Sequence, residues 1–237
     1  YAFKHNNKYY LTFPWVQDKT ETLAYAMADS PMGPFTFTGI IMDESPSGCW
    51  TNHHSITEYN GQWYLFYHHN DYSPNFDKNR SARIDSLFFN TDGTIKKVKP
   101  TLRGVGITDA RSKIQIDRYS TISPYGVTID YLEPSNTFEG WQTLFNRAGT
   151  WVTYNKVDFG TTPLKRLKAR VRSEKGGAIT LRTPGEKGMT IAELPIKPTG
   201  KWTEISTNVS NAPTSMQDLI ITQTGENPVA VDWISFE

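Results

Sequence analysis

Cysteine is nearly absent from this 237-residue chain. The single copy, Cys49, excludes an intramolecular disulfide and any metal site built from paired cysteines. No apolar run approaches the roughly 20 residues that a membrane-spanning helix requires, so no membrane span is predicted. An excess of one charge is also missing, because 25 Lys and Arg residues face 24 Asp and Glu residues. Without a basic surface, nucleic acid and anionic membranes are poor candidates for partners.

The start of the sequence shows no recognisable targeting signal. Its first residue is Tyr1, and no signal-like segment follows it. We therefore expect the sequence to begin at a cut end, and the residues themselves do not predict a cellular compartment.

Strand signals dominate what is present, and long amphipathic helical patterns are missing. Runs such as "NGQWYLFY", "ITLRT" and "KWTEIST" alternate aromatic or β-branched with polar residues and stop at turn residues. Aromatic residues make up 13% of the chain. Such a content suits platforms that stack on sugar rings, and it is equally typical of β-proteins in general. The pattern predicts an all-β protein.

An internal repeat organises the first part of the chain. The stretch "FKHNNKYYLTF" (3–13) aligns with "TEYNGQWYLFY" (57–67), and the offset is 54 residues because His5 falls on Tyr59. This is slightly above the roughly 40–50 residues of a propeller blade. We predict that residues 1–108 form two consecutive β-propeller blades. Since at least about four blades are usual, the blades that complete the propeller are expected upstream.

The pattern changes from about Ile114. Strands then recur at short intervals between regular turn signals, which is typical of a β-sandwich of the jelly-roll kind. We predict a linker at 105–113 and a C-terminal sandwich domain at 109–237.

Four of the five histidines lie in "TNHHSITEYNGQWYLFYHHND" (51–71). Side chains alternate between the two faces of a strand, so only one member of each pair, His53/His54 and His68/His69, can face a given side. A four-histidine metal cluster is therefore not expected.

Several motifs together carry a family resemblance. "YYLTF", "MADSPMGPFTFTG", "TNHHSITEYNGQWYLFYHH" and "NRSARIDSLFFNTDGTI" resemble the C-terminal blades of glycoside hydrolase family 43, a five-bladed β-propeller. "IQID", "WVTYNKVDFG" and "VDWISF" resemble a family 6 carbohydrate-binding module. The first resemblance implies an inverting α-L-arabinofuranosidase or β-xylosidase acting on plant hemicellulose, secreted or periplasmic. The sequence does not choose between arabinose and xylose.

The same resemblance bears on the catalytic residues. In the family, one carboxylate activates water and one carboxylic acid protonates the leaving oxygen, about 6.5–9.5 Å apart. The acid is a Glu that precedes a stretch resembling "YAFKHNNKYYLTF", which places it about three residues upstream of Tyr1. The resemblance places the other carboxylates in earlier blades. We therefore assign no catalytic residue within this sequence.

Three residues of the blades are candidates for substrate binding. His53 matches a family histidine near the propeller axis, where it faces a water-coordinated ion, often calcium, or the catalytic pocket; the alternative is a structural histidine. Arg80 matches an arginine directed into the substrate pocket, where its planar fork suits hydroxyls or carboxylates; the alternative is a surface ion pair. Trp15 could form a wall of the sugar site. His54 is expected to pack between blades.

The resemblance also implies a structural calcium in the sandwich. The matching ligands are Gln115 and Asp117 near the start of the domain and Asp232 near its end. Gln115 stands where the family usually has Glu, so a charged oxygen ligand is lost and calcium affinity should fall. The alternative is that all three are ordinary polar residues at strand ends.

The sugar cleft of the related modules uses two aromatic residues and an Asn. Trp202 matches one aromatic, and Trp141 or Phe145 corresponds to the other. Ala230 replaces the Asn that orients the sugar, which puts sugar binding here in doubt. Two other readings of the chain therefore remain open, a non-catalytic glycan-binding protein and a purely structural scaffold.

Overall fold

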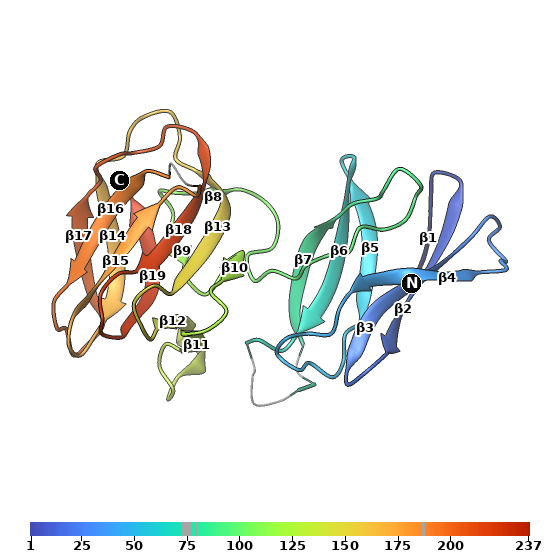
Figure 1. Ribbon diagram of the computed structural model, residues 1–237, viewed down its shortest axis with the longest axis horizontal. Helices are drawn as coiled ribbons and strands as arrows, with labels where there is room; N and C mark the ends of the chain where they lie inside the picture. The colour runs from blue at the N-terminus through green and yellow to red at the C-terminus, as the bar shows by residue number, and fades with distance from the viewer. Residues whose placement is uncertain (73–76, 79, 186–187) are drawn as a thin grey trace. The chain divides into compact units, whose positions relative to one another are not determined.

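The computed structural model describes residues 1–72, 77–78, 80–185 and 188–237. It divides the chain into two compact units, Tyr1–Val105 and Gly106–Glu237 (Figure 1). The sequence placed this boundary three residues later, between 108 and 109. Part of the predicted linker belongs to the second unit, because Thr108–Asp109 forms a short strand within it.

The first unit contains two antiparallel sheets. The first sheet has the order β1-β2-β3-β4 and the second has the order β5-β6-β7. Their strands are β1 (Ala2–His5), β2 (Lys8–Val16), β3 (Glu21–Ala28), β4 (Thr36–Met42), β5 (His54–Tyr59), β6 (Gln62–His69) and β7 (Ser81–Leu87). Each sheet corresponds to one predicted blade.

The internal repeat is visible in the strand register. His5 pairs with Lys8 in the first hairpin, and Tyr59 pairs with Gln62 in the second. The offset is 59 − 5 = 62 − 8 = 54 residues on both strands. Both turns use positive backbone φ, at Asn6 and Asn7 in one and at Asn60 and Gly61 in the other. Such turns match the twist of the flanking strands and fix the register.

The two sheets share one hydrophobic core. It contains Tyr10, Leu23 and Tyr25 from the first sheet, and Ile56 and Leu65 from the second. All five side chains are almost fully buried. The start of β5 thereby contacts the middle of β2 through His54 and Thr12, and the loop before β5 contacts the start of β3 through Asn52 and Glu21.

The chain after β7 departs from the expected blade pattern. Within the described residues, Phe89 and Ile95 form an isolated bridge outside the named strands. The segment instead bonds to the first sheet: the backbone N–H of Ile95 donates to the Tyr25 hydroxyl at 3.0 Å. The Tyr10 hydroxyl donates to the Gly93 carbonyl at 2.6 Å. Two buried tyrosines therefore hold this segment against the neighbouring blade.

The second unit is a β-sandwich, as predicted. One sheet has the order β10-β13-β18-β15-β16 with β8 beside β13, and the other has the order β11-β12-β19-β14-β17 with β9 beside β19. The strands are β8 (Thr108–Asp109), β9 (Ile114–Gln115), β10 (Thr121–Ile122), β11 (Val127–Tyr131), β12 (Trp141–Phe145), β13 (Trp151–Asp158), β14 (Arg166–Arg172), β15 (Gly177–Arg182), β16 (Thr190–Ile196), β17 (Thr203–Asn208), β18 (Met216–Gln223) and β19 (Val229–Phe236).

The inner faces of the two sheets form a second hydrophobic core, separate from that of the first unit. On β14 the alternation is strict: Leu167, Ala169 and Val171 are buried, while cationic residues occupy the intervening positions. Helix is limited to a 3-10 turn, Thr137–Glu139, within the described residues. No helix in that part of the chain is long and apolar enough to cross a membrane.

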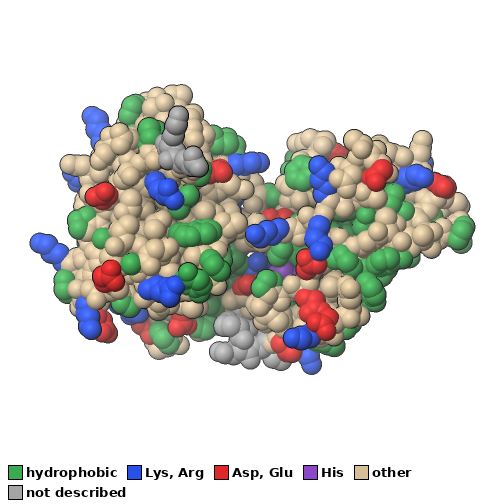
Figure 2. Space-filling view, in the orientation of Figure 1, with side chains coloured by type: hydrophobic (Ala, Val, Ile, Leu, Met, Phe, Trp, Pro, Cys, Tyr) green, Lys and Arg blue, Asp and Glu red, His purple; other side chains and the backbone are tan. Residues whose placement is uncertain are grey.

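The surface agrees with the balanced composition. Lys and Arg side chains lie interspersed with Asp and Glu over the visible face (Figure 2). This distribution gives no broad single-sign patch on that face.

Candidate functional site

The four clustered histidines lie at the strand ends of the second blade and separate into two environments. His54 is largely buried, and its Nε2 is 2.7 Å from Oγ1 of Thr12 on β2. Burial lowers the pKa of His54 to about 4, and the N-terminal ammonium and His53 act in the same direction. His54 is therefore a neutral ring packed between the two blades, as expected from strand alternation.

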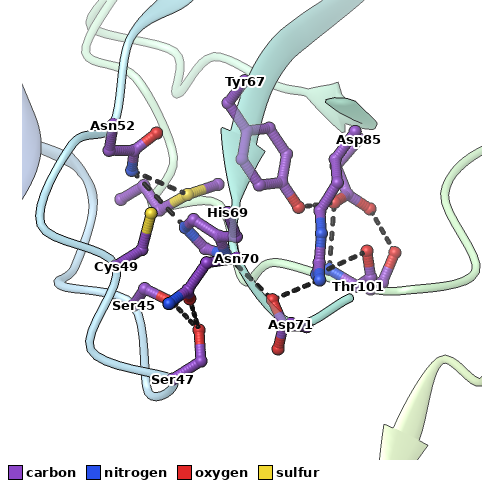
Figure 3. A network of polar contacts seen from close by, with 12 residues as sticks. Ser45, Ser47, Cys49, Asn52, Tyr67, His69, Asn70, Asp71, Asp85 and Thr101 are labelled. Carbon is purple, nitrogen blue, oxygen red and sulfur yellow. Dashed lines mark hydrogen bonds and ion pairs between the residues drawn. The ribbon is translucent and has the colours of Figure 1, made fainter. Parts of the chain in front are cut away.

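His69 is the second buried histidine, with 1% of its surface exposed. Its Nε2 lies 3.5 Å from Nδ2 of Asn52, which is also fully buried (Figure 3). Burial lowers the pKa of His69 to about 3, and the nearby charge of Arg83 contributes. His69 is thus a neutral part of the blade interior and not a solvent-facing base.

His53 and His68 form the second environment. The backbone N–H of His53 donates to Nε2 of His68 at 3.1 Å, and the two rings lie parallel with centroids 6.2 Å apart. Since Nε2 of His68 accepts this bond, the proton of the neutral ring is on Nδ1. That Nδ1 is buried and has no hydrogen-bond partner among the described residues. It is a buried donor that the described residues leave unsatisfied.

Two charged residues lie near this pair. The pKa of His68 is lowered by burial first, then by the charge of Arg80 and by His53, while Glu21 raises it. Glu21 is fixed in place because its Oε2 accepts the backbone N–H of Asn52 at 2.7 Å. We call His53, His68, Arg80 and Glu21 the axial cluster. It offers imidazole, guanidinium and carboxylate groups, all of which can hydrogen-bond sugar hydroxyls.

The structure brings two of the three predicted blade residues together, His53 and Arg80. Trp15 lies elsewhere. It pairs with Thr22 across β2 and β3, one position from the Val16–Glu21 pair, so it points to the opposite face of the sheet from Glu21. There its ring packs edge-on against Phe37 at 5.2 Å. Trp15 is not part of the axial cluster.

Two members of this cluster, His68 and Glu21, were not among the candidates predicted from the sequence. The signal for His68 was available, because a hairpin that pairs Tyr59 with Gln62 also places His53 opposite His68. The sequence around Glu21 does not indicate its position near His68, because that position depends on how β3 packs against the loop before β5.

Two other carboxylates close to these strands are engaged in contacts within the unit. Asp85 accepts hydrogen bonds from the Tyr67 hydroxyl at 2.6 Å, and from the backbone and hydroxyl of Thr101 at 3.0 and 2.7 Å (Figure 3). Burial raises the pKa of Asp85, and these hydrogen bonds oppose the rise. Asp71 forms an ion pair with Arg83. Both carboxylates therefore help to hold the blade and its following segment in place.

The predicted calcium ligands of the sandwich meet where β9 pairs with β19. Gln115 lies opposite Trp233, next to Asp232, and the backbone N–H of Ile116 donates to the Asp232 carbonyl. The Asp232 carboxylate, however, bonds to Arg170 Nη1 at 2.7 Å. Burial raises its pKa, while Arg170 and Lys113 lower it.

This arrangement does not fit calcium. The Asp232 carboxylate already has a cationic partner, and Asp117 lies 3.3 Å from Nε of Arg118. Gln115 is exposed and adds no negative charge. No group of three or more His, Cys, Asp or Glu positioned to hold a metal ion occurs among the described residues. At the axial cluster, Arg80 and Glu21 act on His68 in opposite directions, and a metal ion beside His53 stays a prediction.

Trp202, the predicted sugar platform, lies just before β17. Its ring has the guanidinium carbons of Arg170 and Arg172 at 5.4 and 5.1 Å from the ring centroid. Of the two proposed second aromatics, Phe145 is fully buried in the core and cannot contact a ligand. Trp141 remains accessible and stacks on Tyr131 at 4.4 Å.

Beside these residues lies a pocket of about 340 Å³, whose lining includes Ala230, Arg172, Lys175 and Asn227. This is within the size range of small-molecule sites, roughly 300–1,000 Å³. The position where the related modules carry their Asn is thus the floor of a real cavity.

Comparisons with known proteins agree with this architecture. Residues 123–237 match the family model for carbohydrate binding module family 6. An arabinoxylan arabinofuranohydrolase from Paenibacillus polymyxa is 28% identical over 246 residues, covering 94% of this chain and 38% of that protein. A beta-xylosidase from Xylanibacter ruminicola is 45% identical over 98 residues, covering 40% of this chain and 29% of that protein. The chain therefore spans less than two fifths of either relative.

One solved structure covers both units. It is a glycoside hydrolase family 43 arabinoxylan arabinofuranohydrolase from Bacillus subtilis, in complex with cellotetraose. The match has 24% sequence identity and a TM-score of 0.58, and it covers 99% of this chain and 53% of that chain. At this identity the likeness concerns the fold. It confirms the predicted combination of partial propeller and sandwich.

Proposed function

We propose that the whole protein is a glycosidase. It releases arabinofuranose or xylose from plant hemicellulose. The chain joins propeller blades of the glycoside hydrolase family 43 type to a family 6 type carbohydrate-binding module. The observation that carries the proposal is the set of relatives: the arabinofuranohydrolase matches 94% of this chain at 28% identity, and the xylosidase matches 40% of it at 45% identity. Because the chain covers under two fifths of each, the activity belongs to a longer protein.

The proposed reaction is inverting hydrolysis of an O-glycosyl bond. One carboxylate takes a proton from water, which attacks the anomeric carbon, while a carboxylic acid protonates the departing oxygen. We place both carboxylates in blades that precede these residues. The engagement of Asp85 and Asp71 in structural contacts supports this.

The axial cluster would contribute binding. His53 and Arg80 are both exposed, and Arg80 offers a planar cationic fork. Glu21 balances the charge of Arg80. Such groups orient a sugar ring by its hydroxyls without taking part in proton transfer, so they are positioning residues.

Turnover of p-nitrophenyl arabinofuranoside and p-nitrophenyl xyloside by the complete protein tests this function. We expect release of p-nitrophenol from at least one of them, and no release by the 237-residue chain alone. A complete protein that turns over neither of these, nor arabinan, would contradict the proposal.

A second function, glycan binding without catalysis, is favoured by the match of residues 123–237 to the carbohydrate-binding module. Titration calorimetry with xylo-oligosaccharides tests it in the 237-residue chain. Heat that disappears in Trp202→Ala would support binding at the predicted platform, and absence of heat would count against it.

For the ion and the compartment we propose the following. Arg170, and not calcium, neutralises Asp232, which is supported by their 2.7 Å contact.

The whole protein acts outside the cytoplasm, in a secreted or periplasmic form, because its polymeric substrate does not enter cells. Fractionation of the native host, with activity found only in the cell interior, would refute this placement.

A further inference from the structure

The pocket of the sandwich is built on three side-by-side residues of one sheet. Ala230 on β19 pairs with Leu144 on β12 and with Arg172 on β14, so all three point to the same outward face. The small methyl group of Ala230 between two long side chains leaves the cavity open. The turn after β14 supplies Lys175, and the loop before β19 supplies Asn227.

The lining carries more positive than negative charge. Arg172 and Lys175 both line the pocket, and neither forms an ion pair within the described residues. Glu174 also lines it and acts in the opposite sense. Glu133 lies within the field of Arg172, although hydrogen bonds from Ser135 are the larger cause of its lowered pKa.

Arg172 differs in this respect from the other outward cations of β14. Lys168 pairs with Glu237 at 2.7 Å, and Arg170 pairs with Asp232 at the same distance. Arg166 is exposed at the far end of the strand. Of the outward cations of β14, Arg172 is the one that lines the pocket, and it has no paired carboxylate among the described residues.

The features that would select a neutral sugar are weakened here. The Trp202 ring is covered by two guanidinium groups and offers less open face for stacking. The amide expected at position 230 is replaced by the methyl group of Ala230. What remains is a concave site with two cations, an Asn side chain and an apolar floor.

We infer that this pocket binds a carboxylate-bearing sugar, such as a hexuronate residue of an oligosaccharide, through Arg172 and Lys175. A planar guanidinium matches a carboxylate with two parallel hydrogen bonds, and an ammonium adds a second charge. Asn227 can hydrogen-bond the ring hydroxyls. The inference rests on the proposed function only in taking the ligand to be a glycan.

The decisive probe is a xylotetraose that bears one glucuronate, compared with the same compound after reduction of its carboxylate to an alcohol. Titration calorimetry on the 237-residue chain should give at least about tenfold tighter binding of the acidic form. The preference should weaken as salt is added, because exposed charge pairs are screened. Arg172→Gln should remove about tenfold of the affinity for the acidic form only.

Matched variants separate the pocket from general charge. Arg166→Gln changes the same charge on the same strand about 20 Å away, at roughly 3.3 Å per residue, and should leave binding unchanged. Glu174→Gln removes the opposing charge and should tighten binding of the acidic form. Lys175→Gln provides a second loss-of-charge variant if Arg172→Gln does not fold, and unchanged thermal unfolding shows that each variant is intact.

Equal affinity for the acidic and reduced compounds, no change in Arg172→Gln or Lys175→Gln, or no binding of either compound would each overturn the inference. These outcomes are distinct from failure of the proposed hydrolysis, because calorimetry on this chain measures binding without turnover. If the complete protein hydrolyses pentosides but does not bind the uronate compound, the proposed enzyme function stands and the proposed uronate site is rejected.

Discussion

Thr12 and His54 lie 42 residues apart in the chain, yet Oγ1 of Thr12 and Nε2 of His54 are 2.7 Å apart. The Thr12 hydroxyl donates its one proton to the Tyr1 carbonyl at 3.0 Å. It must therefore accept from His54, which fixes the neutral His54 ring with its proton on Nε2. The bond ties β2 of the first blade to β5 of the second.

This contact predicts a pH-dependent stability. Burial lowers the pKa of His54 to about 4, below its usual 6.5. Between those values the unfolded chain holds a proton that the folded chain lacks, so stability falls as the pH is lowered from about 6.5 to about 4. The loss should reach about 3 kcal/mol at most. Urea unfolding at a series of pH values measures it.

The variant His54→Gln removes the titrating ring and should reduce this slope. His69, with a pKa lowered to about 3 by burial, accounts for the part that remains. Thr57→Ala is the control, because Thr57 is an exposed, uncharged residue of the same strand β5. Identical slopes in the parent chain and His54→Gln would show that the inter-blade histidine does not contribute.

The Arg170–Asp232 pair predicts the behaviour of the sandwich toward metal. Since Arg170 already neutralises Asp232, chelation by EDTA should not change the Tm of the parent chain. Arg170→Gln leaves a largely buried carboxylate without its partner, which should cost about 3 kcal/mol. In that variant alone, added calcium should restore part of the Tm. A Tm of the parent chain that drops with EDTA would instead support a bound metal.

The sequence predicted what depends on short-range pattern. The hairpin repeat, its Asn-containing turns and its register follow from alternation and turn chemistry, and the structure reproduces the 54-residue offset. Alternation also separated His54 from His53. These features are local, because about ten consecutive residues are enough to determine a turn type and a two-residue alternation.

Contacts between distant segments were not predictable in this way. Nothing near Asp232 indicates that Arg170, 62 residues earlier, takes its carboxylate. Phe145 matched an aromatic position, yet its place on β12 buries it in the core. Both outcomes are set by which strands become neighbours in the sheet, a property of the whole fold. The missed residue Glu21 follows the same rule.

The Tyr67–Asp85 contact predicts the stability of the second blade. The Tyr67 hydroxyl donates to Asp85 at 2.6 Å inside the protein, and Asp85 in turn holds Thr101. Tyr67→Phe removes one donor from a buried carboxylate and should destabilise the chain by about 1–3 kcal/mol. Chemical denaturation measures the change.

Tyr59→Phe is the matched control, because Tyr59 is 67% exposed and its loss of a hydroxyl should stay within about 0.5 kcal/mol. If both variants unfold at the same denaturant concentration, the buried hydrogen bond is not important for the fold.

The axial cluster predicts a kinetic effect in the complete protein. Arg80 is exposed. Its charge is the second-largest cause, after burial, of the lowered pKa of His68. If Arg80 binds the sugar as proposed, Arg80→Gln removes one charge-assisted contact and should lower kcat/KM by about tenfold. It should also raise the pKa of His68, so the acidic limb of the pH profile moves to higher pH. Pentoside hydrolysis across pH measures both effects.

Lys78→Gln is the matched control for this variant. Lys78 is an exposed cation two residues from Arg80, and its charge is not among those that shift the pKa of His68. It should change neither kcat/KM nor the pH profile. A general effect of surface charge would lower kcat/KM in both variants alike, and a purely structural Arg80 would lower the Tm without moving the acidic limb. If Arg80 faces both the sugar and His68, Arg80→Gln changes kcat/KM and the pH profile, and Lys78→Gln changes neither.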